Sequence, residues 1–130
     1  MAQTQILSKN QQMVFQIIEK AKGPLKAYSI LYDVQKKGIK APLQVYRALD
    51  KLLELGKIHK IESRNAFVAC RHSEGETQVM VAFTICDSCG EVAEISDDSF
   101  DRRLQKLANT MGFTLTKSTV ELSGLCSTCE

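Results

Sequence analysis

The sequence lacks the features that mark several large classes of protein. The longest apolar runs are short and interrupted by lysine, glutamate or threonine, so none approaches the roughly 20 residues that a membrane-spanning helix needs. The first eight residues contain no basic start, apolar stretch and small-residue cleavage site of the kind that directs secretion. Internal repeats and low-complexity tracts are also absent. In a chain of 130 residues, these absences predict a cytoplasmic protein of one or two small globular domains without a membrane partner.

The formal charge is unevenly distributed along the chain. Residues 1–72 contain 13 Lys and Arg against 5 Asp and Glu, or +8, whereas residues 73–130 contain 4 against 10, or −6. A basic half suits a polyanion such as nucleic acid, because each phosphate that it neutralises releases condensed counterions. The polar stretch between the two halves lacks apolar periodicity. We therefore expect domains at 1–72 and 79–130, joined by a hinge at 73–78.

The first domain has the pattern of three short helices followed by a hairpin. Ser8 and Gln11 have the spacing of a capping box at the start of the first helix, and helices at 27–37 and 42–55 follow. After Gly56 the apolar period changes to two, which predicts a β-hairpin over residues 58–70. A hairpin directly after a third helix is typical of a winged helix-turn-helix.

The second domain is predicted as a small α+β unit. Strands are expected at 79–85 and 91–95, and a helix at 97–111 with Ser96 as a possible cap. Two further short strands are expected at 113–115 and 120–122.

Four of the five cysteines form two CxxC pairs, Cys86 with Cys89 and Cys126 with Cys129. This spacing aims two thiolates at one ion, and two such pairs complete the tetrahedral shell of a structural zinc. A closed shell leaves no position for a substrate, and we find no nucleophile–base arrangement in a chain with two histidines, so an enzyme is not expected. A redox dithiol is the weaker alternative, because neither pair lies between a strand and a helix.

The fifth cysteine, Cys70, belongs to neither CxxC pair. If residues 64–65 form a two-residue loop, Cys70 lies directly opposite His59, with their Cβ atoms roughly 5 Å apart on one face of the hairpin. Such a pair can ligate a transition metal, with Glu94 or His72 completing the shell. The alternative is a buried free cysteine beside a satisfied histidine, with His72 a solvated loop residue.

A polar stripe runs along the third predicted helix. Gln44, Arg47 and Lys51 fall at positions i, i+3 and i+7, opposite the leucines. In the major groove of DNA, glutamine pairs with adenine and arginine with guanine, whereas Lys51 suits a phosphate. Asp50 and Glu54 dilute the positive charge, and a solvated helix face would carry the same stripe.

Four motifs together resemble a known family. They are Tyr46-Arg-Ala-Leu-Asp50, His59-Lys-Ile-Glu-Ser-Arg-Asn-Ala-Phe-Val-Ala-Cys70, Ile85-Cys-Asp-Ser-Cys-Gly90 and Gly124-Leu-Cys-Ser-Thr-Cys129. The family is that of the ferric uptake regulators (Fur), and within it the likeness is greatest to the zinc-uptake regulators. The resemblance covers nearly the whole chain.

The resemblance implies a homodimeric, metal-dependent bacterial repressor of the α+β class. Its N-terminal winged helix-turn-helix would be followed by a small α/β dimerisation domain with a four-cysteine zinc site. It also implies a second, regulatory zinc site at the hinge, to which His59, Cys70 and Glu94 would contribute. The family usually has a histidine shortly before the first CxxC, but residues 78–83 read Gln-Val-Met-Val-Ala-Phe. His72 is the remaining histidine that can replace it, and water or a three-ligand site are the alternatives.

The resemblance also implies residues that contact DNA. Tyr28 and Arg47 match positions that contact bases, and with Gln44, Tyr46 and Lys51 they form the predicted DNA-binding set. We therefore predict a zinc-responsive repressor that binds a double-stranded DNA operator as a dimer and controls zinc-uptake genes. One alternative is a Fur-type regulator that responds to iron, manganese or peroxide. Another is a winged-helix and zinc subunit that binds proteins and never reads DNA.

Overall fold

The computed structural model describes residues 6–70 and 80–130. The chain divides into two compact units, Met1–Glu74 and Gly75–Glu130, and each is described by itself. The predicted hinge at 73–78 and His72 lie outside the described residues. Every helix in the described residues is too short or too polar to cross a lipid bilayer.

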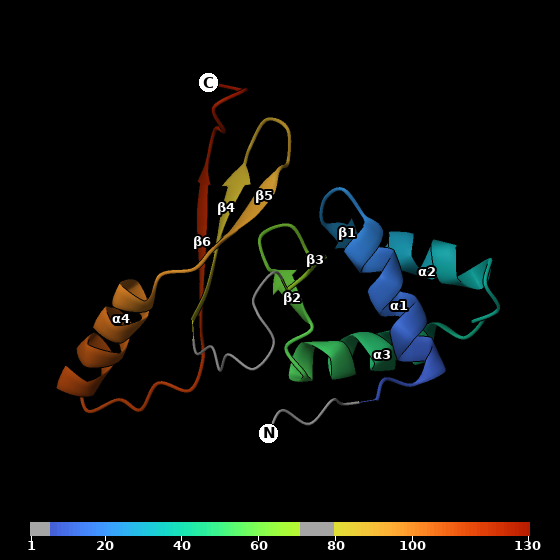
Figure 1. Cartoon of the computed structure of the whole chain (residues 1–130), viewed down its shortest axis with the longest axis horizontal. Helices are drawn as coiled ribbons and strands as arrows, with labels where there is room; N and C mark the ends of the chain where they lie inside the picture. Colours follow the sequence, from blue (N-terminus) through green and yellow to red (C-terminus); the bar gives the residue numbers. More distant parts are fainter. Residues whose placement is uncertain (1–5, 71–79) are drawn as a thin grey trace. The chain divides into compact units, whose positions relative to one another are not determined.

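The first unit contains three helices, α1 (Lys9–Lys20), α2 (Ala27–Gln35) and α3 (Pro42–Glu54) (Figure 1). The predicted capping box of α1 is confirmed: Gln11 N donates to Ser8 Oγ over 3.2 Å, and Ser8 N donates to Gln11 Oε1 over 2.9 Å. Helix α3 begins with Pro42, whose missing N–H has no helical partner at that position anyway, and Gly56 follows its end with φ +74°.

A three-stranded sheet completes this unit, with β1 (Leu25–Lys26), β3 (Ala66–Ala69) and β2 (Ile58–Ile61) in that order. Helices α1 to α3 with the β2–β3 hairpin form the predicted winged helix-turn-helix. The short strand β1 was not predicted, because two residues carry no readable alternation. It extends the hairpin by pairing Leu25 with Phe67.

The predicted register of the hairpin is wrong by two residues. His59 lies opposite Val68, and not opposite Cys70. The turn spans the four residues 62–65 instead of two, and it ends at Asn65 in the left-handed region with φ +50°. Because the shift is even, Cys70 remains on the same face of the hairpin as His59, as its diagonal neighbour.

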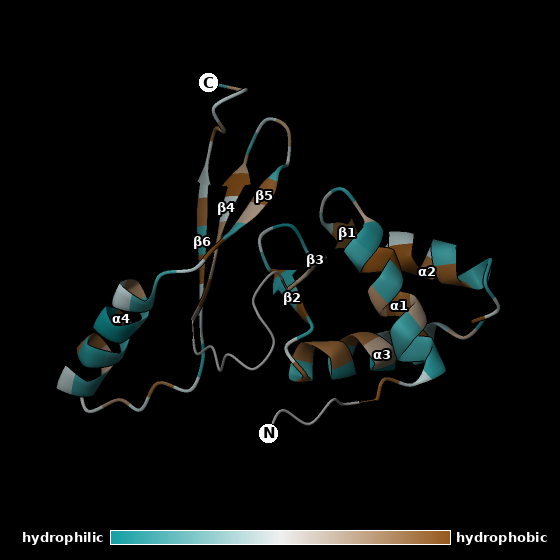
Figure 2. Ribbon diagram, viewed as in Figure 1, coloured by the Kyte–Doolittle hydropathy of each residue, from teal (hydrophilic) through white to brown (hydrophobic). Residues whose placement is uncertain are grey.

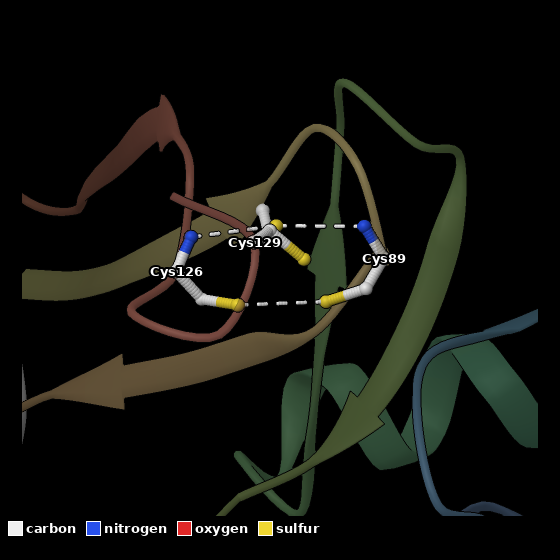
Figure 3. A group of neighbouring side chains, drawn as sticks. Cys89, Cys126 and Cys129 are labelled. Atoms are coloured by element: carbon white, nitrogen blue, oxygen red, sulfur yellow. Dashed lines mark hydrogen bonds between the residues drawn. The ribbon is translucent and has the colours of Figure 1, made fainter.

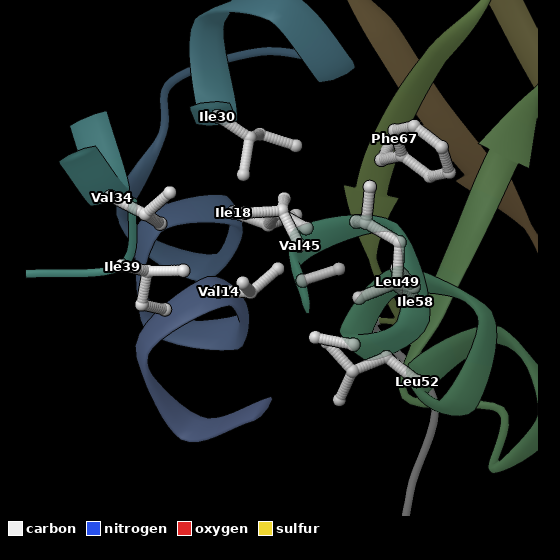
Figure 4. Close-up of a cluster of buried hydrophobic side chains, with 12 residues drawn as sticks. Val14, Ile18, Ile30, Val34, Ile39, Val45, Leu49, Leu52, Ile58 and Phe67 are labelled. Carbon is white, nitrogen blue, oxygen red and sulfur yellow. The ribbon is translucent and has the colours of Figure 1, made fainter. Parts of the chain in front are cut away.

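The core of the first unit lies between its three helices and the hairpin (Figure 4). Its twelve buried side chains come from every helix and from both long strands: Val14, Ile18, Ile30, Val34, Ile39, Val45, Ala48, Leu49, Leu52, Ile58, Phe67 and Ala69. On α3 these side chains recur at three- and four-residue intervals and leave the opposite side of the helix to solvent. The polar stripe predicted on α3 is therefore held at the surface by the packing of its apolar side.

The second unit contains the sheet β5-β4-β6 and one helix. Its elements are β4 (Met80–Cys86), β5 (Val92–Ile95), α4 (Asp98–Thr110) and β6 (Ser118–Gly124). Strand β4 is central; it pairs antiparallel with β5 and parallel with β6. The parallel pair joins segments far apart in the chain and was not predicted.

Two predictions for this unit are corrected at the ends of α4. The cap is Asp97 and not Ser96, because Phe100 N donates to Asp97 Oδ1 over 3.1 Å. The strand predicted at 113–115 does not form. Phe113 N instead donates to Ala108 O over 2.9 Å, which ties this segment to the C-terminal end of α4.

Burial differs sharply between the elements of this unit. Strand β4 is mostly hydrophobic in colour in Figure 2, and six of its seven residues are buried, whereas α4 is mostly hydrophilic and has no buried residue. Large apolar side chains on and after α4 remain exposed, among them Phe100, Leu107, Met111 and Phe113. Helix α4 thus leaves an apolar side uncovered in the single chain.

Candidate metal centre and nucleic-acid interface

The parallel pairing of β4 with β6 brings the two cysteine pairs together. Both strands end at the same edge of the sheet, where Cys86 lies opposite Gly124. The turn that carries Cys89 follows β4, and the turn that carries Cys126 and Cys129 follows β6. Asp87 N donates to Gly124 O over 2.7 Å and joins the two turns directly. Segments 36 residues apart in the chain therefore meet at one site, as the zinc prediction required.

The four sulfur atoms have the spacing of a tetrahedral metal centre. They all lie within 4.8 Å of one another, and the Sγ atoms of Cys89 and Cys126 are 3.8 Å apart. Figure 3 shows the sulfurs of Cys89, Cys126 and Cys129 turned toward a common centre. A Zn–S bond of about 2.3 Å implies a tetrahedron whose edges are about 3.8 Å long. The donor set and its geometry thus fit a zinc ion with four thiolate ligands.

Hydrogen bonds prepare one of the sulfurs for this role. The backbone N–H groups of Cys89 and Cys126 each donate to Cys86 Sγ over 3.4 Å, and they lower the pKa of the Cys86 thiol to about 6. The neighbouring Cys126 thiol raises the pKa of Cys129 to about 12. One sulfur therefore ionises readily near neutral pH, while accumulation of further negative charge is opposed until a cation neutralises it.

His59 and Cys70 also come together, within the first unit. The ligand atoms of the two side chains lie within 4.8 Å of each other, and the Nε2 atom of His59 is buried. Their closeness follows from the shared face of the hairpin and not from the direct pairing that we predicted. Glu94 lies on β5 of the second unit, and His72 is outside the described residues.

The predicted DNA-binding residues lie on two helices of the first unit. Gln44, Tyr46, Arg47 and Lys51 are all exposed on α3, and Tyr28, near the start of α2, is 79% exposed. Lys51 Nζ lies 3.6 Å from Glu54 Oε1. This ion pair is solvent-exposed, so it contributes little to stability, but it shares the positive charge of Lys51 with a carboxylate.

A model of the ferric uptake regulator family matches residues 5–123, which is most of the chain. The chain belongs to this family. Sequence and structural comparisons find several of its members. The zinc uptake regulation protein of Escherichia coli (strain K12) is 38% identical over 117 residues, which cover 89% of this chain and 68% of that protein.

Two solved structures within the family are similar over almost the whole chain. The crystal structure of holo XcZur has a TM-score of 0.89 and 39% identity, and the match covers 98% of this chain and 88% of that one. A zinc uptake regulator in complex with zinc and DNA has a TM-score of 0.87 and 36% identity, over 95% of this chain and 83% of that one. The resemblance inferred from the four motifs is therefore confirmed, and so is the predicted fold class.

Two residues on the exposed side of α2 were missed by the sequence reasoning. Lys36 Nζ lies 4.3 Å from the centre of the Tyr32 ring, and Tyr32 is 56% exposed. Both continue the four-residue spacing that starts at Tyr28. The spacing is visible in the sequence, but the contact between the ring and the ammonium leaves no motif there.

Proposed function

We propose that this protein is a zinc-dependent repressor of the ferric uptake regulator family, which binds operator DNA as a homodimer in the cytoplasm and controls zinc-uptake genes. The observation that carries the proposal is its similarity, over 95% of the chain, to a zinc uptake regulator complexed with zinc and DNA. The charge division supports it, because the basic half of the chain contains the winged helix.

In this proposal residues 1–72 bind DNA, residues 79–130 form the dimer, and the hinge at 73–78 connects them. The exposed face of α3 offers Arg47 and Gln44 to base edges and Lys51 to a phosphate, next to Tyr46; Tyr28 on α2 supplies a further base contact. The uncovered apolar side of α4 supports the assignment of the second unit to dimerisation, since contact with a second copy would bury it.

The four cysteines hold a structural zinc in this proposal. The ion cross-links the turn after β4 to the turn after β6, and its four thiolates leave no open position for a substrate. A closed centre supports regulation and not catalysis as the role of the protein.

A second, regulatory zinc is assigned to His59, Cys70 and Glu94, with His72 as the fourth ligand. The nearness of the His59 and Cys70 ligand atoms supports the first two assignments. Thiolate and imidazole are ligands that zinc accepts readily. With ligands from both units of a chain, the ion would favour one orientation of the two winged helices of the dimer over others. It would thereby change the affinity of the dimer for DNA.

A different effector remains the second candidate. The stretch 78–83 has no histidine where the family usually has one, which favours a changed regulatory site that answers iron, manganese or peroxide. Titration of DNA binding with zinc, manganese and ferrous ions, and a separate exposure to peroxide, distinguish these versions. The proposal requires that zinc activates DNA binding at a lower free concentration than manganese or ferrous ions do.

The whole proposal is tested by selection of duplexes from a random DNA library with the zinc-loaded protein. We expect enrichment of one palindromic sequence, loss of binding after chelation of the exchangeable metal, and an affinity that falls steeply as salt rises. A protein that enriches no sequence and shows no salt-dependent binding would instead be a protein-interaction subunit.

Arg47 and Lys51 provide a matched pair of variants on the same face of α3. Arg47→Ala should narrow the difference in affinity between the selected duplex and a random duplex by about 1–3 kcal/mol, because a base contact is lost. Lys51→Ala should weaken both complexes by the same factor. Equal losses on both duplexes for Arg47→Ala would make Arg47 a phosphate contact.

A further inference from the structure

The exposed side of α2 carries a row of three side chains, of which the proposed DNA-binding set includes only the first. Tyr28, Tyr32 and Lys36 follow one another at intervals of four residues, so they lie on one side of the helix. The other side is fixed by Ile30 and Val34, which are buried in the core (Figure 4). The row therefore has a fixed orientation in the first unit.

Tyr32 and Lys36 form a defined pair within this row. The ammonium of Lys36 lies 4.3 Å from the centre of the Tyr32 ring, which is a favourable cation–π distance. Lys36 is also the C-terminal cap residue of α2, where the helix dipole favours a positive charge. Both effects hold the ammonium near the surface of the helix and reduce the number of conformations that a free lysine would sample.

Lys36 contacts an uncharged aromatic ring, whereas Lys51 contacts a carboxylate. Glu54 lies 3.6 Å from Lys51 and competes with any anion for its charge. An aromatic ring attracts an ammonium through its quadrupole and carries no net charge, so Lys36 keeps its full positive charge for an external anion.

The first helix of a helix-turn-helix crosses the DNA backbone while the second enters the major groove. From Tyr28 to Lys36 the rise along a helix is about 12 Å, which is close to the width of the major groove. If Tyr28 contacts bases within the groove and α2 crosses the backbone, Lys36 lies at the right distance to meet the phosphates at the edge of the groove.

We propose that Lys36 contacts a phosphate of the DNA backbone and that Tyr32 is the positioning residue that holds its ammonium toward that phosphate. The inference rests on the proposed function, and it adds a contact that carries no sequence information. This contact should raise the affinity for DNA of any sequence, and it should make that affinity more dependent on salt.

The test uses the full-length, zinc-loaded protein with the selected duplex and with a random duplex of equal length. Affinities are measured between 0.05 and 0.2 M salt. Lys36→Ala should weaken both complexes by the same factor and reduce the salt slope by about 0.9, the value for one phosphate contact. The loss should then shrink about 3.5-fold across this range of salt.

The role of Tyr32 is separated by two further variants. Tyr32→Phe keeps the ring and should retain the wild-type slope, whereas Tyr32→Ala should weaken both complexes about two- to fivefold. In the double variant, Tyr32→Ala should add no loss beyond that of Lys36→Ala. Lys20→Ala is the matched control, because it removes an exposed lysine from the last turn of α1, on a different helix of the same unit.

The outcomes separate this inference from the proposed function. If the wild-type protein binds no DNA, the proposed function fails. If it binds and Lys36→Ala has the wild-type slope, only the phosphate contact fails. A loss confined to complexes with several protein copies on one duplex would overturn the inference as well, because the row would then face a second copy and not a phosphate.

Discussion

The two units of the chain are stabilised in different ways. In the first unit, twelve buried side chains from three helices and a hairpin form one core. In the second unit, the buried residues within the described range all belong to the single strand β4, and α4 buries none. The first unit thus resembles a small domain that stands on its own hydrophobic core. In our proposal, the second depends on a zinc ion held by its four clustered cysteines and on a second copy that covers its apolar surface.

This difference predicts that the stability of each unit can be changed without changing that of the other. A small unit without a sufficient core can obtain its stability from metal binding, because the site does not exist in the unfolded chain. Loss of the structural metal should therefore affect the second unit far more than the first, whereas a core substitution in the first unit should leave the metal centre intact.

The largest effect is expected from Cys86→Ser or Cys129→Ser. Either variant removes one of four ligands of an ion whose binding provides on the order of 10 kcal/mol of folding free energy in small zinc domains. We expect loss of zinc, loss of the dimer and unfolding of the second unit, while α1 to α3 remain folded. Metal analysis, sedimentation and amide hydrogen exchange measure the three effects.

Ser127→Ala is the matched control, because Ser127 is exposed in the same turn but offers no thiolate. A cysteine variant that remains a dimer of wild-type thermal stability in the presence of a chelator would refute the four-cysteine assignment.

A substitution in the core of the first unit should destabilise that unit and leave the second unit unchanged. Leu49→Ala leaves a cavity in the core beneath α3 and should cost about 2–5 kcal/mol in the free energy of unfolding of this unit. Leu43→Ala on the exposed side of the same helix should cost far less. Zinc content and dimerisation should be unchanged in both. Loss of zinc in Leu49→Ala would mean that the two units do not fold independently.

Coupling between the units is addressed by Cys70→Ser. The variant should fold, dimerise and keep the four-cysteine zinc, yet added zinc should no longer strengthen DNA binding, a loss of coupling of about 1–3 kcal/mol. His72→Ala then distinguishes a fourth ligand from a site completed by water. A wild-type response to zinc in Cys70→Ser would refute the regulatory assignment.

The smallest effect concerns the start of α1. Ser8→Ala removes the side chain that accepts from Gln11 N, and it should destabilise the first unit by about 0.5–2 kcal/mol. Ser8→Asp, which can accept the same hydrogen bond, should restore most of this stability. Thermal unfolding of the first unit is the measurement, and equal stability of Ser8→Ala and the wild type would show that the cap contributes nothing.

Local patterns predicted most of the first unit and only parts of the second. The cap at Ser8, the start at Pro42 and the stop at Gly56 depend on neighbouring residues, so they were readable from the sequence. The hairpin register was not, because it depends on the length of the turn that ends at Asn65. The pairing of β4 with β6 depends on segments far apart in the chain, and no local pattern records which strands become neighbours.

The candidate sites follow the same division. The spacing within each CxxC pair indicated a metal, and the geometry of the four sulfurs agrees with that prediction. The nearness of His59 and Cys70 was expected for a partly wrong reason: a register shift of two residues preserved the face that both side chains share. Tyr32 and Lys36 were missed because a contact between an aromatic ring and an ammonium adds no motif to the sequence.

The parallel pairing of β4 with β6 also determines when each half of the protein can fold during synthesis. Strand β6 ends at Gly124, and the ligands Cys126 and Cys129 follow it, so the central strand lacks one neighbour until this region has left the ribosome. The winged helix lies entirely before this region in the chain, so it can fold earlier during synthesis. The nascent chain therefore carries the apolar strand β4 and the thiols of Cys86 and Cys89 before β6 and the other two cysteines of the metal centre have been made.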